Sequence, residues 1–470
     1  MRITFIGHAS ILIEANGVRI LSDPWWNGPC FGAQWWPYPV PYVQAIQGPP
    51  IDYVYISHGH HDHFHPPTLK LFQGAKVLVA AGSELSGSIR NLGFEVIESD
   101  GSTDRELQNG VRCRIMVTYA DDTLLAVSDG KETCINLNDA LHAAPEAVQQ
   151  KFCRLIRQFY GRPDYVFCGY GTASHFPNCY VIPGKDPSRT AAMRQAYFNR
   201  AWARIIHDLR PRCGFAFAAD VVFLESELSW CNEAVHNAER PTEAFEKQFG
   251  SSTETRVVDV APGFEINQGA IVRGSVRQRL SQDEVRQVYS DAIERVNRSA
   301  PVGTQTVCEL KDLLERNILK GEGYFGGYEG DFRCLLQIKG TSVGIRVAKT
   351  GRKVNVEMVE EAGENEKSYD VVYRTRASYL RQSLATPYGH ETLFVGSGGI
   401  FEFRDRSALG AGIHRELMTM LRPFDGGAVR RSVAKSGVIA AAKRSLKRLL
   451  GMSSSDLYDL ERWTIFHRID

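Results

Sequence analysis

Residues 57–65 read SHGHHDHFH and follow directly on the apolar run IDYVYI of residues 51–56. Four of the nine side chains fit the pattern HxHxDH, namely His58, His60, Asp62 and His63. In an extended segment alternate side chains point the same way, so the first two histidines share one side and the following turn brings the aspartate and the third histidine to a neighbouring point. Imidazole and carboxylate are ligands for zinc, iron and manganese. The stretch therefore predicts two adjacent metal positions at the end of a strand.

Around this stretch, the first half of the chain alternates short β-branched runs with longer amphipathic ones. The expected strands include RITFIG, SILIEA, VRILSD, DYVYIS, KVLVAAG and TCINLND. Helices are expected over residues 145–161 and 186–209, each bounded by proline or glycine. This alternation is typical of a layered α/β domain, which we place at residues 1–270.

The pattern changes near residue 270. A solvated helix is expected over residues 281–297, and four alternating strands follow it, RCLLQIKG, SVGIRVAK, KVNVEMVEE and SYDVVYRT. Their short polar turns predict an antiparallel meander within an α+β domain at residues 280–425. Residues 426–470 are expected to form a basic amphipathic tail, which is either an interfacial membrane anchor or a helix docked on the protein.

The composition limits the classes of function. Lysine and arginine total 55 against 54 aspartates and glutamates, so no net field attracts nucleic acid to the whole chain. The ten cysteines are scattered singly, which excludes a cysteine-based zinc ribbon or a clustered iron–sulfur site within these residues. The first residues, MRITFIGHASILIEANG, read as neither a signal peptide nor a membrane span. We therefore expect a cytoplasmic protein, or one that is peripheral on a membrane, and no nucleic-acid partner.

Three segments carry a resemblance to a known superfamily, ISHGHHDHFHPPTLK, FIGHASILIE and ILSDPWWNGPCFGAQWW. They resemble the metallo-β-lactamase-fold metallohydrolases, in particular the branch that contains CMP-N-acetylneuraminate hydroxylase and related sugar-N-acyl or lipid phosphodiester enzymes. The resemblance covers roughly residues 1–265. It implies an αββα sandwich of two sheets with helices outside. At one edge it implies a site for one or two divalent metal ions, with zinc expected first and iron or manganese as alternatives.

The resemblance also implies where further metal ligands lie. Asp139, at the end of TCINLND, matches the bridging aspartate, and His175 would supply the terminal ligand at the second metal. The usual third histidine has no counterpart, so Asp122 would replace it as an oxygen ligand, with Asp121 as the fallback. A loop aspartate that caps a turn is an equal interpretation of Asp122.

His8 and Asp23 follow strands in this branch, where either could orient a metal ligand by a hydrogen bond. For Asp23 the cap of an Asp-Pro turn is the alternative. His61 and His65 lie inside the histidine cluster but outside its pattern. The other histidines are expected on the surface or in the core, and they are His142, His207, His236, His390, His414 and His467. The aromatic segment of residues 25–39, WWNGPCFGAQWWPYP, is either a substrate wall or an aromatic minicore.

These features predict a metal-dependent hydrolase. A metal-bound hydroxide would attack a phosphodiester, amide or ester of a sugar-, nucleotide- or lipid-linked substrate, and Asp62 would orient the water or accept its proton. One alternative is an oxidoreductase component that resembles the sialate hydroxylase and works with a separate Rieske protein, since this sequence has no paired cysteines and histidines for the cluster. The other is a non-catalytic scaffold. Besides the small-molecule or glycan- or nucleotide-linked substrate, a membrane surface and a second copy of the chain are candidate partners.

Overall fold

The computed structural model describes residues 1–423 apart from 119–121, 172–176, 237, 275–276, 299, 322–329, 352, 361–363, 387–388 and 411–412. The chain divides into two compact units. The first comprises Met1–Thr172, Ala192–Phe223 and Ser229–Ser290, and the second comprises Ala173–Ala191, Leu224–Leu228 and Asp291–Asp470. The predicted basic tail lies outside the described residues. Among those described, no helix is both long enough and apolar enough to cross a membrane.

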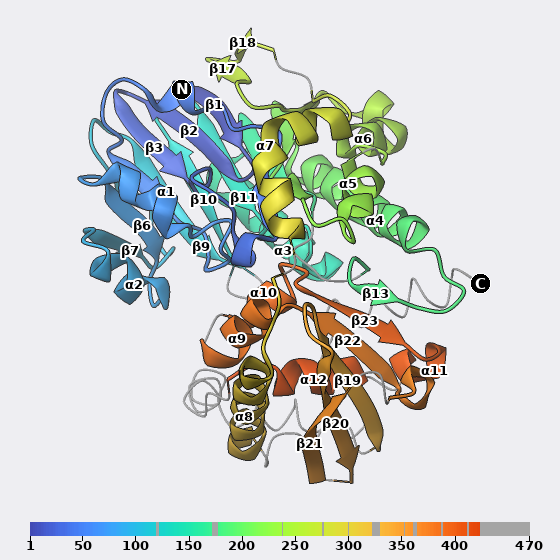
Figure 1. Ribbon diagram of the computed structural model, residues 1–470. Coiled ribbons are helices and arrows are strands. Elements are labelled where there is room, and N and C mark those ends of the chain that lie inside the picture. The colour runs from blue at the N-terminus through green and yellow to red at the C-terminus, as the bar shows by residue number, and fades with distance from the viewer. Residues whose placement is uncertain are drawn as a thin grey trace. The chain divides into compact units, whose positions relative to one another are not determined.

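Two large β-sheets form the frame of the first unit (Figure 1). One has the strand order β18-β17-β1-β2-β3-β5-β6-β7. Its strands are β1 (Arg2–Gly7), β2 (Ser10–Ala15), β3 (Val18–Ser22), β5 (Tyr53–Tyr55), β6 (Lys76–Ala80), β7 (Val96–Ser99), β17 (Glu265–Asn267) and β18 (Ala270–Arg273). The other has the order β16-β14-β12-β11-β10-β9-β8. Its strands are β8 (Arg105–Glu106), β9 (Arg112–Val117), β10 (Thr123–Ser128), β11 (Thr133–Asn138), β12 (Tyr165–Gly169), β14 (Cys213–Phe217) and β16 (Arg256–Asp259).

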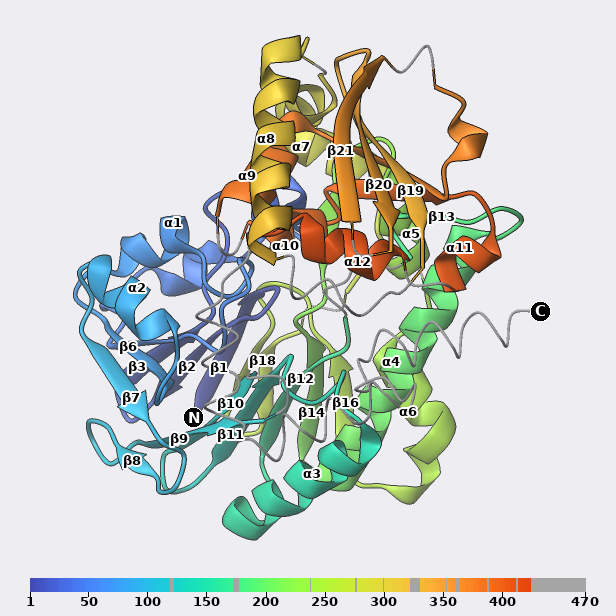
Figure 2. The same cartoon turned by 90° about the horizontal axis from the view of Figure 1, so that it is seen from below.

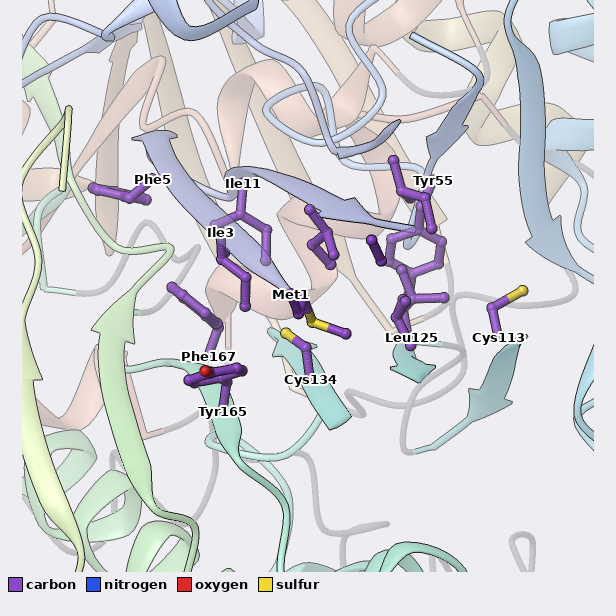
Figure 3. Packing of buried hydrophobic residues seen from close by; sticks show 14 of the residues in the cluster. Met1, Ile3, Phe5, Ile11, Tyr55, Cys113, Leu125, Cys134, Tyr165 and Phe167 are labelled. Atoms are coloured by element: carbon purple, nitrogen blue, oxygen red, sulfur yellow. The ribbon is translucent and has the colours of Figure 1, made fainter. Parts of the chain in front are cut away.

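A buried core joins the facing sides of the two sheets. Alternate side chains of each strand point to one face of its sheet, and Ile3, Ile11 and Tyr55 from the first sheet meet Leu125 and Phe167 from the second (Figure 3). Central strands such as β3 and β12 are buried at every position, so they are covered on their outer faces as well. Both sheets therefore need a helical layer outside.

Helices supply that outer layer on both sides (Figure 2). Helices α1 (Pro66–Leu69) and α2 (Leu85–Asn91) bury Leu69 and Ile89 against the outer face of the first sheet. Helices α3 (Glu146–Tyr160), α4 (Pro187–Leu209) and α6 (Pro241–Phe249) bury Ile156, Trp202 and Phe245 against the second. The αββα sandwich predicted from the sequence is confirmed. The remaining named elements are the strand pair β4 (Trp35–Pro37) and β15 (Val221–Phe223) and the helices α5 (Ser229–His236) and α7 (Gln282–Asn297).

The second unit is built on a six-stranded sheet of order β13-β23-β22-β19-β20-β21. Its strands are β13 (Tyr180–Val181), β19 (Phe332–Ile338), β20 (Val343–Thr350), β21 (Lys353–Glu360), β22 (Val371–Thr375) and β23 (Gly399–Phe403). Its helices are α8 (Thr304–Gly321), α9 (Ala377–Ala385), α10 (His390–Leu393), α11 (Arg406–Gly410) and α12 (Ile413–Met420).

The predicted meander is correct for three strands and wrong for the fourth. Strands β19, β20 and β21 pair antiparallel in sequence order, but β22 pairs parallel with β19 on its other side. The burial patterns give the reason, because β22 is buried almost throughout, as a central strand is, whereas β21 is largely half-exposed, as suits an edge. Alternation along a strand sets its two faces and leaves its neighbours undetermined.

Candidate metal centre

Most of the predicted site residues that the structure describes lie where several strands end at one edge of the sandwich. Strands β1 and β3 both pair antiparallel with β2, so they run in the same direction, and β5 pairs parallel with β3. Their carboxyl ends place His8, Asp23 and the HxHxDH segment together. In the second sheet β11, β12 and β14 are parallel, so Asp139 and Ala218 lie at one edge of that sheet. The N–H of Ala218 donates to the carbonyl of His8 at 3.0 Å, which joins the two edges.

Strained backbone marks these strand ends. Left-handed φ angles occur at His8 (48°), Asp23 (35°), Asn138 (44°) and Ala218 (54°). A non-glycine residue in this region costs on the order of 1–3 kcal/mol and persists where its surroundings hold it firmly. The turns direct the following side chains away from the strand axis and across the sheet edge.

His58 and His60 form the first candidate metal position. The Nε2 atom of His58 lies 2.8 Å from Nδ1 of His60, and Nδ1 of His58 lies 2.9 Å from the Ser57 hydroxyl oxygen. Burial lowers the pKa of both imidazoles, to well below the usual range for His58. Both rings are therefore neutral near pH 7. Two neighbouring neutral imidazoles are a donor pair that suits a borderline divalent cation.

The second candidate position surrounds Nε2 of His63. This atom lies 3.4 Å from Oδ2 of Asp62 and 3.6 Å from Oδ2 of Asp139. Within the described part of the chain, His63 Nε2 and Asp62 Oδ1 are buried without a hydrogen-bond partner. Buried polar atoms are nearly always paired, so these unpaired atoms fit a bound cation. Two triads have ligand atoms within 4.8 Å of one another, His8–Asp62–His63 and His58–His63–Asp139.

The charges at this position depend on one another. Burial raises the pKa of Asp62, but the neighbouring His63 and His8 outweigh it and hold the pKa well below its usual range. Burial lowers the pKa of His63, yet the carboxylates of Asp62, Asp139 and Asp23 raise it well above its usual value. The Asp62 carboxylate is thus anionic at neutral pH. A metal at Nε2 of His63 competes with a proton there, so metal occupancy should fall as pH falls.

Asp23 sets the orientation of His63. Its fully buried carboxylate accepts hydrogen bonds from the Ser57 N–H (2.8 Å), the Ser57 hydroxyl (2.7 Å) and Nδ1 of His63 (2.9 Å). A carboxylate only accepts, so the hydrogen-bond network assigns a proton to Nδ1 and turns Nε2 toward the centre. Metal-binding histidines usually show this arrangement. The structure places Asp23 where the sequence predicts an orienting residue.

For three further predicted ligands, the role in metal binding stays a prediction. Oδ1 of Asp122 lies 3.9 Å from Nδ1 of His58, the ring nitrogen that does not face His60. This position suits a residue that orients His58, and the role of Asp122 as a replacement ligand stays a prediction. Asp121 and His175 lie outside the described residues. Their proposed roles as fallback and terminal ligand stay predictions as well.

His8 contacts a predicted ligand directly. Its Nε2 lies 2.9 Å from Oδ2 of Asp62, and its Nδ1 lies 3.2 Å from the carbonyl oxygen of Asp220. The ring packs edge-on against Trp25, with 5.1 Å between the centroids. His8 is 6% exposed, so these contacts form in a dry environment. The sequence implied an orienting role for His8, and the structure places it in contact with Asp62.

Side chains of the aromatic segment, residues 25–39, pack against histidines at the site. Trp25, Phe31 and Trp35 are buried, and the Phe31 ring stacks on His61 with 5.1 Å between centroids. The sequence left two interpretations open, a substrate wall and an aromatic minicore. The burial of these three residues agrees with the minicore. Trp36 is half-buried and packs edge-on against Tyr289 of α7.

One residue near the site was not singled out by the sequence. His142 is buried, and its Nδ1 has no hydrogen-bond partner among the described residues. A Cβ placed on Gly169 would lie 3.2 Å from both Nδ1 of His142 and Oδ1 of Asp139, so the glycine leaves room for both groups. The signal was its position three residues after Asp139, in the turn that follows a strand.

Comparisons with known proteins show what this chain is similar to. The family model described as "Beta-lactamase superfamily domain" matches residues 2–123, which therefore carry such a domain. Over 331 residues the chain is 26% identical to a "Putative Rieske 2Fe-2S iron-sulfur protein" of Mycobacterium tuberculosis, covering 64% of this chain and 61% of that protein. Over 69 residues it is 41% identical to cytidine monophosphate-N-acetylneuraminic acid hydroxylase of Danio rerio, covering 14% and 12%. The resemblance inferred from the sequence is confirmed.

The matches cover only part of this chain and of its relatives. The chain spans 61% of the length of the mycobacterial relative. Among solved structures, the metallo hydrolase Igni18 of Ignicoccus hospitalis superimposes with a TM-score of 0.37 at 17% identity, covering 56% of this chain and 97% of that one. The fold assignment accordingly rests on the family model and on the two-sheet topology described above.

Proposed function

We propose that this edge of the sandwich is the active site of a metal-dependent hydrolase. One observation carries the proposal: in the HxHxDH segment, His63 Nε2 and Asp62 Oδ1 are buried and unpaired among the described residues, close to further imidazoles and a carboxylate. Residues 2–123, which include the HxHxDH segment, match the family model described as "Beta-lactamase superfamily domain". The substrate class is a phosphodiester, amide or ester of a sugar-, nucleotide- or lipid-linked molecule. Zinc is the expected metal, with iron or manganese as alternatives.

Different residues of the chain would bind the metal and orient its ligands in such a site. When bound, a divalent metal supplies a water of lowered pKa and stabilises developing negative charge. His58 and His60 would hold one ion, while His63 and Asp139 would hold another or share it. Asp23 keeps the Nε2 of His63 directed at the centre through its hydrogen bond to Nδ1.

Asp62 is the proposed catalytic residue. His63 and His8 hold the pKa of its carboxylate well below the usual range, so it stays anionic across neutral pH. An anion of that kind is a weak base and a good hydrogen-bond acceptor. We therefore expect Asp62 to orient the attacking water more than to remove its proton.

The proposal is tested by metal content and turnover in parallel. Replacing both His58 and His60 by alanine should remove most of the bound metal and abolish hydrolysis of bis(p-nitrophenyl) phosphate and p-nitrophenyl acetate. The matched control is His207→Ala, since His207 lies on α4 and stacks on Phe249 away from the strand ends. Unchanged metal content in the double variant would contradict the metal centre. Full metal without hydrolysis in the wild type would favour the scaffold.

A second candidate function is an oxidoreductase component. The similarity to the mycobacterial protein named for a Rieske cluster supports it. Such a cluster needs paired cysteine and histidine ligands, which these 470 residues lack, so the cluster would come from another polypeptide or segment. Iron at the centre whose visible spectrum changes when a reduced Rieske protein is added would favour this function. Zinc in the purified protein and no spectral response would count against it.

A further inference from the structure

Two histidines approach Asp62 in the same way. His63 donates from Nδ1 to the Asp23 carboxylate and turns Nε2 toward Asp62 Oδ2 at 3.4 Å. His8 has its Nδ1 3.2 Å from the Asp220 carbonyl oxygen and turns Nε2 toward the same Oδ2 at 2.9 Å. A carbonyl oxygen only accepts, so with a metal ion on Nε2 the ring proton of His8 would lie on Nδ1 and be donated to the Asp220 carbonyl. Metal-binding histidines usually donate their second ring N–H to such an acceptor.

The contact between His8 and Asp62 needs a positive centre. A ring nitrogen with a lone pair and an anionic carboxylate oxygen repel at 2.9 Å unless a proton or a metal ion lies between them. Oδ1 of Asp62 is also buried and unpaired within the described residues, so no donor on its other side offsets the charge. The pair therefore holds either a proton or a metal ion.

The spacing of the three groups suits a metal. Four ligands at about 2.1 Å from a tetrahedral ion stand roughly 3.4 Å apart. The distances from Asp62 Oδ2 to Nε2 of His8 and to Nε2 of His63 are 2.9 and 3.4 Å, and the ligand atoms of all three lie within 4.8 Å of one another. All three side chains are at least 94% buried, which suits a site that excludes water on the protein side.

We infer that His8 is itself a metal ligand, and that His8, Asp62 and His63 together hold the second metal ion of the centre. This inference rests on the proposed metal centre and deepens it, because it adds an imidazole that neither the HxHxDH pattern nor the resemblance assigns as a ligand. Asp139, whose Oδ2 lies 3.6 Å from Nε2 of His63, borders this position and the one at His58.

The surroundings of His8 hold it in place for this role. The Asp220 side chain accepts a hydrogen bond from Tyr170 at 3.0 Å and forms an ion pair with Arg277, which fixes the loop that presents its carbonyl to His8. Trp25 closes one side of the ring. A ligand locked by a second layer of contacts loses little freedom on binding a metal.

The test is the zinc stoichiometry of the full chain. In His8→Gln the side-chain amide can still donate to Asp62 near the place of Nε2, but it offers no imidazole lone pair. We expect bound zinc to fall from two equivalents to one in this variant, and the visible absorption of the cobalt-substituted protein to change. In His8→Ala, added imidazole should restore the second equivalent. His207→Gln is the matched control, with two equivalents expected.

The outcomes separate this inference from the function on which it rests. If His8→Gln keeps two equivalents with zinc affinity within twofold of the wild type, His8 only positions Asp62 and the inference is wrong. If the double variant at His58 and His60 also keeps its zinc, the proposed metal centre itself is wrong. If His8→Gln is poorly folded, the imidazole titration of His8→Ala decides, because restored zinc requires a vacated ligand position and unrestored zinc contradicts one.

Discussion

Asp23→Asn should weaken metal binding although Asp23 is not itself a proposed metal ligand. The wild-type carboxylate accepts from three donors, two on Ser57 and one on His63. An asparagine has one acceptor oxygen and one NH2 group, so in either orientation its NH2 faces an N–H or O–H donor. With the oxygen toward the Ser57 N–H, the NH2 faces Nδ1 of His63. The imidazole then has to accept there, and its proton moves to Nε2, the nitrogen directed at the metal.

The size of the effect follows from two contributions. Loss of a residue that orients a metal-binding histidine typically weakens metal affinity 10- to 100-fold, equivalent to about 1.4–2.8 kcal/mol. The buried donors also lose a charged acceptor, whose hydrogen bonds are worth about 1.5–3 kcal/mol. We therefore expect zinc affinity to fall at least about tenfold and the thermal midpoint of unfolding to fall as well.

The assay is competition for zinc against a fluorescent chelator, with the melting curve recorded for each protein. Asp52→Asn is the matched control, since Asp52 accepts a backbone N–H from Arg19 at 2.8 Å in the same sheet. Ser57→Ala removes one donor to Asp23 but leaves the Nδ1 proton of His63 in place, so it should change affinity less. If Asp23→Asn binds zinc within twofold of the wild type, the tautomer argument is refuted.

Three further predictions follow from the same geometry and from the tail. Asp139→Asn should lower bound metal and turnover more than Asp122→Asn, because Asp139 borders both candidate positions whereas Asp122 lies beside Nδ1 of His58; equal losses in elemental analysis would contradict this. Burial lowers the pKa of His65 from 6.5 to about 4, so the unfolded chain binds the proton more readily than the folded chain. The contribution of neutral His65 to stability is therefore complete above about pH 6.5, and roughly 3 kcal/mol is lost as the pH drops from there through 4. His65→Gln should show a shallower fall in melting temperature over that range, and an unchanged slope would assign the effect elsewhere. Deletion of residues 427–450 should abolish co-sedimentation with anionic vesicles at low salt, and an intact protein that ignores such vesicles would favour the docked helix.

Much of the metal centre could be anticipated because its core is local in sequence. The HxHxDH residues lie within six positions, so covalent geometry and the end of one strand bring them together wherever that strand is placed. Central strands such as β12 were recognisable for a similar reason, since the apolar run of β12 reflects burial on both faces. The predicted strand TCINLND and β11 of the structure end within one residue of each other. Asp139 could therefore be recognised as a residue at the end of a strand.

The orientation of the site residues required the tertiary structure. The hydrogen bond from His63 to Asp23 joins residues 40 positions apart, and the contact of His8 with Asp62 joins residues 54 positions apart. Two further features could not be read from the sequence. Asp122 lies beside Nδ1 of His58, and β22 pairs parallel with β19. By itself the sequence determined which side chains occur and which local segment carries them, because the spacing along one strand is a short-range property. Sheet order decided which strand ends meet, and with it which ring nitrogen of each histidine faces the candidate metal position, because pairing between distant strands depends on the packing of the whole core.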